Sequence, residues 1–286
     1  MEEVLKMSYR LPEVVDTSMR KLNEALQARL PQTIESFYVY GSTALNAYVN
    51  GSSDIDFLVF VNRTLIPSDI QFIIEAHRLV ELEFPTLDIM GAYIRQEDAG
   101  KSLNEIPPFP KYHDKTLDFN GNGDINPVTW WVLKKYGICI YGQQKAFEYE
   151  ISSDELVQYV FGNLNTYWVG WIERLEHQLS LTDISEPTTL EQIKQLDFAV
   201  EWCTLGMLRQ YYSIKEYDVI SKVAAGEYGL KLLPDRWHGL IREAIAIKRL
   251  ERTREYSSYL KRLCDLVELL RLIHTESTAF YNKIRR

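Results

Sequence analysis

Residues 38–61, YVYGSTALNAYVNGSSDIDFLVFV, constrain the fold of this chain more than any other stretch. The stretch begins as an aromatic and β-branched run, which favours a strand, and the run ends at Gly41 and Ser42. Residues 43–48 have helix-forming character, and the turn-rich sequence NGSS follows them. A second apolar run, residues 54–61, predicts another strand. The order strand, Gly-Ser, helix, turn, strand indicates an α/β domain.

Two details of this stretch point to phosphate chemistry. Residues two apart on a strand project to the same side, so Asp54 and Asp56 form a carboxylate pair. Such a pair, with no basic residue beside it, suits a hard divalent cation such as Mg²⁺. A glycine between a strand and a helix lets backbone N–H groups approach a phosphate, and Gly41 stands at such a position. Together the two features outline a phosphoryl-transfer site.

The rest of the chain predicts two domains. A mixed-sheet α/β domain should occupy residues 1–147, and an all-α helical bundle residues 148–286, since no alternating strand pattern appears in the second half. We expect residues 96–122 to be irregular and residues 180–187 to form a loop between two helices. The predicted helices are 11–30, 67–83, 126–136, 154–179, 188–212, 215–228, 234–250 and 254–284, and the further predicted strands are 86–93 and 137–142.

The composition indicates which kinds of partner this chain binds. The net charge of −8 argues against a nucleic-acid polymerase, which normally presents a basic face to phosphates, and it suits a small cationic substrate better. Three widely spaced cysteines fit a reducing compartment, and no run approaches a membrane span. We therefore expect a cytoplasmic protein, a monomer or weak dimer, with no nucleic-acid or membrane partner.

The first motif, from Gly41-Ser42 to Asp54 and Asp56, resembles the signature of the DNA polymerase β-like nucleotidyltransferases. The second half is similar to the helical domain of bacterial aminoglycoside 3″/9-adenylyltransferases in the spacing from Arg209 to Lys222 and on to Pro234. This resemblance implies ATP as co-substrate and two Mg²⁺ ions. It implies that the metal ligands are Asp54, Asp56 and Asp88, and that the nucleotide contacts are Gly41, Ser42, Ser53, Asp124, Arg209 and Lys222.

Asp88 has more than one possible role. It is the only acid in an apolar predicted strand, which is costly without a metal or hydrogen-bond partner. In aminoglycoside-modifying relatives the third acid is the candidate general base that deprotonates the acceptor hydroxyl. Streptomycin and spectinomycin relatives carry Glu at this position, so metal ligand, general base or both remain open for Asp88.

The resemblance implies transfer of AMP from ATP to a hydroxyl of an aminoglycoside or aminocyclitol antibiotic, and hence resistance. A polycationic drug needs acids and aromatic faces, for which Trp168, Trp171 and Asp197 are the candidates. The alternatives are a nucleotidyltransferase that acts on another small hydroxyl compound, such as a lincosamide, or on a macromolecule. A catalytically silent nucleotide-binding relative is the alternative from another class.

Overall fold

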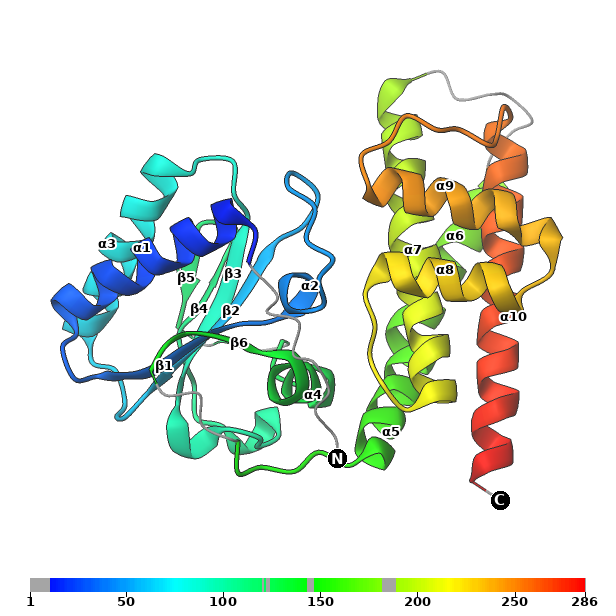
Figure 1. Ribbon diagram of the computed structural model, residues 1–286. Coiled ribbons are helices and arrows are strands. Elements are labelled where there is room, and N and C mark those ends of the chain that lie inside the picture. The colour runs from blue at the N-terminus through cyan, green and yellow to red at the C-terminus, as the bar shows by residue number, and fades with distance from the viewer. Residues whose placement is uncertain (1–10, 120, 122–123, 143–146, 182–188, 286) are drawn as a thin grey trace, which may run out of the picture. The chain divides into compact units, whose positions relative to one another are not determined.

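The computed structural model describes residues 11–119, 121, 124–142, 147–181 and 189–285. It divides the chain into two compact units, Met1–Ile151 and Ser152–Arg286 (Figure 1). The first unit combines a sheet with helices and the second is helical, which confirms the predicted fold class. The predicted loop over residues 180–187 lies almost entirely outside the described residues.

The sheet of the first unit has six strands in the order β5-β4-β3-β2-β1-β6. Only β2 and β3 run parallel, and every other neighbouring pair is antiparallel, so the sheet is mixed as predicted. The parallel pair is possible because helix α3 (Pro67–Glu83) provides the crossover between its strands. The strands are β1 (Ile34–Val39), β2 (Ile55–Val61), β3 (Ile89–Arg95), β4 (Lys111–His113), β5 (Thr116–Asp118) and β6 (Ile138–Tyr141).

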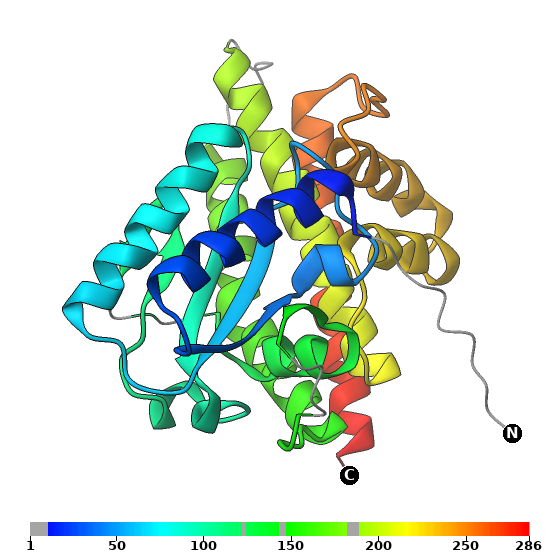
Figure 2. The ribbon, with the colours of Figure 1, turned by 60° about the vertical axis from the view of Figure 1, so that its left-hand side comes forward.

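One face of this sheet is covered by α1 (Glu13–Arg29) and α3 (Pro67–Glu83), which lie side by side in Figure 2. Alternate residues of β2, such as Ile55 and Phe57, are fully buried in the core that these helices share. The period of two therefore sends the neighbouring residues, Asp54 and Asp56, to the opposite face of the sheet. Because α1 and α3 cover one face of β2, the two aspartates lie on the other face.

Short elements complete the first unit. Helix α2 (Gly41–Ala44) is a single turn, so the prediction of a helix over residues 43–48 was wrong in both start and length. Helix α4 (Pro127–Tyr136) is capped by the Asn126 side chain and leads into β6. The stretch expected to be irregular, residues 96–122, contains the β4–β5 hairpin and two 3₁₀ turns, Gln96–Asp98 and Leu103–Glu105. Strands of three residues between prolines carry too little periodicity to be recognised.

The second unit is built around the long helix α7, against which α5, α8, α9 and α10 pack. The predicted helix over residues 215–228 begins too early. Helix α7 continues to Glu216 and ends at Tyr217 in a left-handed conformation, and Ser221 caps the start of α8. A π-helical segment, Leu164–Trp168, joins α5 to α6. The helices are α5 (Ser153–Asn163), α6 (Val169–Leu181), α7 (Leu190–Glu216), α8 (Lys222–Leu232), α9 (His238–Lys248) and α10 (Tyr259–Ile284).

Candidate active site

The carboxylate pair lies at the start of β2. Asp54 directly precedes the strand and Asp56 is its second residue, and both side chains are half-buried on the face away from α1 and α3. The side chains of Ile55 and Phe57, between and after them, are 0% exposed in the core. Burying these apolar neighbours therefore holds both acids on one surface.

Gly41 lies against one of these acids. A Cβ atom at Gly41 would lie 1.7 Å from Asp56 Oδ2, and the φ of Gly41 is +62°. The Tyr40 N–H also donates to the Asp56 carbonyl oxygen at 3.0 Å. Only glycine fits this position, because any side chain would overlap the carboxylate and strain the backbone. The turn and the acid pair are thus one structural unit.

The turn also presents an unsatisfied hydroxyl. Ser42 Oγ and Thr43 Oγ1 are buried and have no hydrogen-bond partner among the described residues. An orphaned buried hydroxyl is costly unless a ligand or water completes it. Because α2 has only one turn, a phosphate here would be held by individual hydroxyl and N–H donors rather than by a helix dipole.

Asp88 lies at the same end of the next strand. It directly precedes β3, and β2 and β3 are parallel with Ile55 opposite Ile89, so Asp88 and Asp54 occupy equivalent positions. The Ile55 N–H donates to the Asp88 carbonyl oxygen at 2.8 Å. Partial burial raises the pKa of the Asp88 carboxyl, and the negative charges of Asp54 and Asp114 raise it further. A raised pKa makes a carboxylate a stronger base toward an acceptor hydroxyl.

Asp54 and Asp56 suit a hard cation, because Mg²⁺ is commonly held by one or two carboxylates together with phosphate oxygens and water. Gly41 keeps the space beside Asp56 free of a side chain. Among the residues that the structure describes, however, no group of three His, Cys, Asp or Glu side chains could hold a metal ion. The pair fits the predicted metal, and participation of Asp88 as a third ligand stays a prediction.

Lys111 lies near the acids, although no sequence pattern predicted it as a site residue. It begins β4, its side chain is 15% exposed, and its ammonium pairs with the carboxylate of Asp124. Lys111, Asp124, Tyr40 and Asp56 line one small cavity. Burial raises the pKa of the Tyr40 hydroxyl, and Asp56 and Asp124 raise it further, so Tyr40 stays protonated there. Lys111 was missed because its strand falls in a stretch with no recognisable pattern.

Ser53, expected to contact the nucleotide, serves the loop before β2. Its side chain is largely buried and its hydroxyl accepts the Val49 N–H at 3.1 Å, while the Ser53 N–H donates to the Val49 carbonyl at 2.8 Å. These two bonds close the turn that delivers Asp54 to the strand. A direct contact with the nucleotide stays a prediction.

In the helical unit, Lys222 is the first residue of α8 and Arg209 lies in α7. Lys222 Nζ is 2.9 Å from Glu201 Oε1 and 4.3 Å from the centroid of the Trp202 ring. The ammonium of Lys222 is therefore already partly neutralised. A phosphate would share or replace the bond to Glu201.

The aromatic residues of this unit divide into core and surface. Trp168 is 5% exposed and packs on Gly206, where a Cβ would lie 2.1 Å from the indole, so Trp168 has a core position. Trp171 is half-buried, and its ring centroid is 6.1 Å from that of Phe198. Phe198 is 52% exposed and stacks on Trp202 with centroids 5.7 Å apart. Trp171, Phe198 and Trp202 thus form an aromatic cluster near the surface of this unit, with Arg174 over the Trp171 ring and Lys222 over the Trp202 ring.

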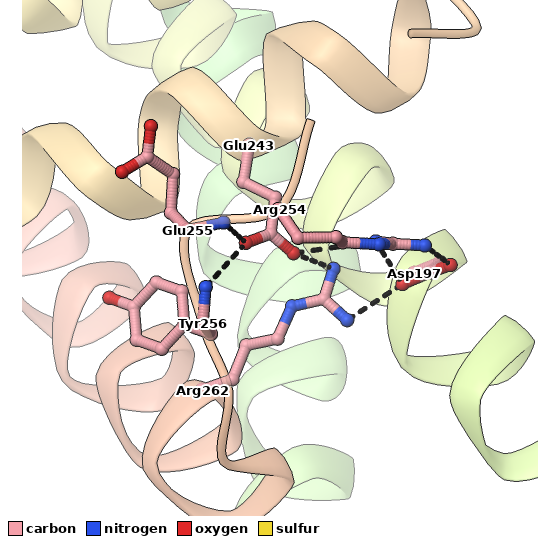
Figure 3. Close-up of polar contacts among 6 residues, drawn as sticks. All are labelled: Asp197, Glu243, Arg254, Glu255, Tyr256 and Arg262. Atoms are coloured by element: carbon pink, nitrogen blue, oxygen red, sulfur yellow. Dashed lines mark hydrogen bonds and ion pairs between the residues drawn. The ribbon is translucent and has the colours of Figure 1, made fainter. Parts of the chain in front are cut away.

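Asp197 belongs to an ion-pair network (Figure 3). Its carboxylate accepts from Arg254 and from Arg262, each at 2.7 Å. Glu243, which is 0% exposed, contacts both guanidinium groups and accepts the N–H of Glu255 at 2.8 Å. The network ties the segment after α9 to α7. To bind a cationic substrate, Asp197 would have to exchange these partners, so its predicted substrate contact has no support from this geometry.

Two family models match the chain. Residues 19–100 match the nucleotidyltransferase domain, and residues 184–271 match the aminoglycoside adenylyltransferase C-terminal domain. A comparison with curated proteins found no significant match. No helix in the described part of the chain has the length and apolar character needed to cross a bilayer.

Among solved structures, the spectinomycin adenyltransferase AAD(9) from Enterococcus faecialis, determined with ATP and spectinomycin, has a similar fold. The TM-score is 0.61 at 15% identity, and the match covers 89% of this chain and 98% of that one. A STING-associated CdnE c-di-GMP synthase from Capnocytophaga granulosa matches 94% of this chain and 83% of its own at 12% identity. Its TM-score is 0.23, which is too low to bear on the fold.

The acid pair on β2, the glycine turn beside it and the first family match define a nucleotidyltransferase. The chain combines a nucleotidyltransferase domain with a domain that matches the aminoglycoside adenylyltransferase C-terminal domain.

Proposed function

We propose that the protein transfers AMP from ATP to a hydroxyl of an aminoglycoside or aminocyclitol antibiotic of the streptomycin or spectinomycin type. The match of residues 184–271 to the aminoglycoside adenylyltransferase C-terminal domain carries this proposal, because the first domain alone does not select an acceptor. ATP as co-substrate is supported by the AAD(9) structure, which contains it. Modification of the drug would protect the cell that produces the enzyme.

Asp54 and Asp56 would hold Mg²⁺, which when bound neutralises phosphate charge and activates the α-phosphorus. The Ser42 hydroxyl, which has no hydrogen-bond partner in the described part of the chain, would donate to a phosphate oxygen of ATP. Arg209 and Lys222 are the proposed further donors to the triphosphate, and Asp124 the proposed further contact of the nucleotide. A guanidinium suits this task because its planar donors match phosphate oxygens.

Asp88 would take the proton of the acceptor hydroxyl. The drug oxygen then forms a bond to the α-phosphorus of ATP, the bond from that phosphorus to the β-phosphate bridging oxygen breaks, and pyrophosphate leaves with the electron pair. The raised pKa of Asp88 favours proton acceptance, and its position beside Asp54 places it near the carboxylate pair. The aromatic cluster of Trp171, Phe198 and Trp202 is the proposed platform for the cationic drug. The drug would have to take the place of Arg174 and Lys222, whose cations lie over the two indole rings.

The direct test is to incubate the protein with labelled ATP, MgCl₂ and either spectinomycin or streptomycin. We expect a drug–AMP product from one or both, no product with EDTA, and at least a 1,000-fold slower reaction for Asp54→Asn, in line with the loss of a charge-stabilising group. Transfer to neither drug, with transfer to a lincosamide in the same panel, would reassign the acceptor. Equal rates for wild type and Asp54→Asn would reject the mechanism.

A further inference from the structure

A second cavity lies in the first unit, at the other end of β2 from the acid pair. It has a volume of about 480 Å³, within the range of small-molecule sites. The last residue of β2, Val61, lines it, whereas Asp54 precedes the first, so roughly 20 Å of strand separates the two places. We call it the Glu35 cavity, and its lining includes Glu35, Ser36, Glu97, Phe147, Glu148 and Tyr149.

The Glu35 cavity is acidic. Glu35 and Glu148 have no ion-pair partner among the described residues. The one cation in the described lining, Arg95, is neutralised, because its guanidinium lies 2.8 Å from Asp98 Oδ2 and 2.5 Å from Glu97 Oε1. Two unpaired carboxylates in a concave site attract cations and repel phosphates. The nucleotide is therefore a poor ligand for this cavity.

Its wall is aromatic. The ring centroid of Phe147 lies 5.1 Å from that of Tyr38 and 5.3 Å from that of Tyr149. Ring faces attract ammonium groups and also cover the methylene carbons between them. A bare metal ion would use the carboxylates but gain nothing from these rings, so the lining favours an organic cation.

A polar group also lacks a partner here. Ser36 lines the cavity, is 7% exposed, and its hydroxyl has no hydrogen-bond partner among the described residues. It lies on the sheet face opposite the α1–α3 core, because β1 pairs Ser36 with Phe60, whose side chain lies outside that core. The Ser36 oxygen is not one of the fully enclosed polar atoms, so a ligand or water in the cavity can reach it. An ammonium group supplies the N–H donor that the Ser36 oxygen can accept.

We propose that the Glu35 cavity is a binding site for a small organic cation with two or more amino groups on a hydrocarbon chain. Glu35 and Glu148 each hold one ammonium group, and Phe147 covers the carbons between them. This site is separate from the nucleotide chemistry at Asp54, and it does not depend on which acceptor the enzyme modifies.

Titration calorimetry of the full-length protein with spermidine at low ionic strength tests the proposal. We expect one-to-one binding that weakens as NaCl is raised. The double variant Glu35→Gln and Glu148→Gln should bind at least tenfold more weakly, and Phe147→Leu severalfold more weakly. Both glutamines are isosteric replacements of unpaired carboxylates, and an unchanged circular dichroism spectrum checks that the fold is kept.

Two control variants separate binding in the Glu35 cavity from binding to other carboxylates of the protein. Glu24→Gln removes the same charge from the exposed surface of α1, on the other side of the sheet, and should change the affinity less than twofold. Asp54→Asn should also leave spermidine binding unchanged. No binding to the wild type, equal affinity of the double variant, or a comparable loss in Glu24→Gln or Asp54→Asn would each overturn the proposal.

Discussion

Gly41 and Asp56 are so close that a single methyl group on Gly41 would occupy the position of the Asp56 carboxylate, at 1.7 Å from Oδ2. The glycine belongs to the turn after β1 and the aspartate to β2, which pairs with β1 antiparallel. The contact therefore links the predicted phosphate-binding turn to the predicted metal ligand. Any change that moves one of them moves the other.

Gly41→Ala should cost activity more than stability. The left-handed φ of +62° costs an alanine roughly 1–2 kcal/mol, while displacement of the Asp56 carboxylate should lower kcat/KM at least 100-fold. Gly170→Ala is the matched control, because that glycine lies in α6 with open space around its Cβ position. The control should keep full activity and gain up to about 1 kcal/mol. Steady-state kinetics and urea unfolding measure both effects, and equal kcat/KM values for the two variants would contradict the account.

The acid limb of the pH–rate profile should report Asp88. Its raised pKa means that the carboxylate form is lost as pH falls toward that pKa from above, so kcat/KM should fall at acidic pH. Asp114 raises this pKa and Lys115 lowers it. Asp114→Asn should therefore move the limb to lower pH, and Lys115→Gln should move it to higher pH. Shifts in the same direction for both variants would show that the limb belongs to another group.

His77 should make the first unit sensitive to acid. It is 2% exposed, Nε2 is bonded to the Tyr93 hydroxyl at 2.8 Å, and burial lowers the pKa of His77 to about 3. Above pH 6.5 the imidazole is neutral in both folded and unfolded chains, so it has no effect. Between pH 6.5 and 3 only the unfolded chain takes up the proton, so stability falls as pH falls, by about 2 kcal/mol between pH 7 and pH 5.

Replacing His77 by glutamine tests this dependence. His77→Gln keeps a group that can bond to the Tyr93 hydroxyl but cannot titrate, so its urea unfolding midpoint should fall less between pH 7 and pH 5 than that of the wild type. His177→Gln, at an exposed position, is the control and should behave like the wild type. If His77→Gln and the wild type lose stability in parallel, the acid sensitivity lies elsewhere.

Glu243 should matter for the stability of the helical unit. It is 0% exposed and contacts the guanidinium groups of Arg254 and Arg262, the latter only 7% exposed at its side chain. Glu243→Gln leaves a buried guanidinium under-compensated and should cost about 3 kcal/mol by urea unfolding. Arg236→Gln breaks the exposed pair with Glu268 instead and should cost under about 1 kcal/mol. Similar losses for the two variants would show that burial does not govern this network.

The sequence predicted correctly those helices whose first and last residues lie next to a proline or another residue that starts or stops a helix. Helix α3 was predicted with its observed bounds because Pro67 opens it and Pro85 follows it. The start of α8 was missed, since the signals there are the left-handed Tyr217 and the Ser221 cap rather than apolar spacing. The acid pair could be predicted because a period of two determines which side of a strand a residue occupies.

Contacts between residues that lie far apart in the sequence could not be predicted in this way. The sequence offered Asp197 as an acid for a cationic drug, yet it bonds to Arg254, 57 residues later, through a loop whose path no local pattern specifies. Lys111 reaches Asp124 because a three-residue strand adds to the edge of β3. The burial of Trp168 could not be predicted either, because it depends on Gly206 in another helix, and its substrate contact stays a prediction.

The central claim, that Asp54 and Asp56 hold the divalent cation beside the nucleotide, is tested most directly by electron paramagnetic resonance with Mn²⁺ and a non-hydrolysable ATP analogue. We predict that the wild type binds Mn²⁺ in the presence of the analogue, and that Asp56→Asn binds it at least 100-fold more weakly. Asp154→Asn, at an exposed position, should retain the wild-type affinity. Undiminished Mn²⁺ binding by Asp56→Asn would contradict the account.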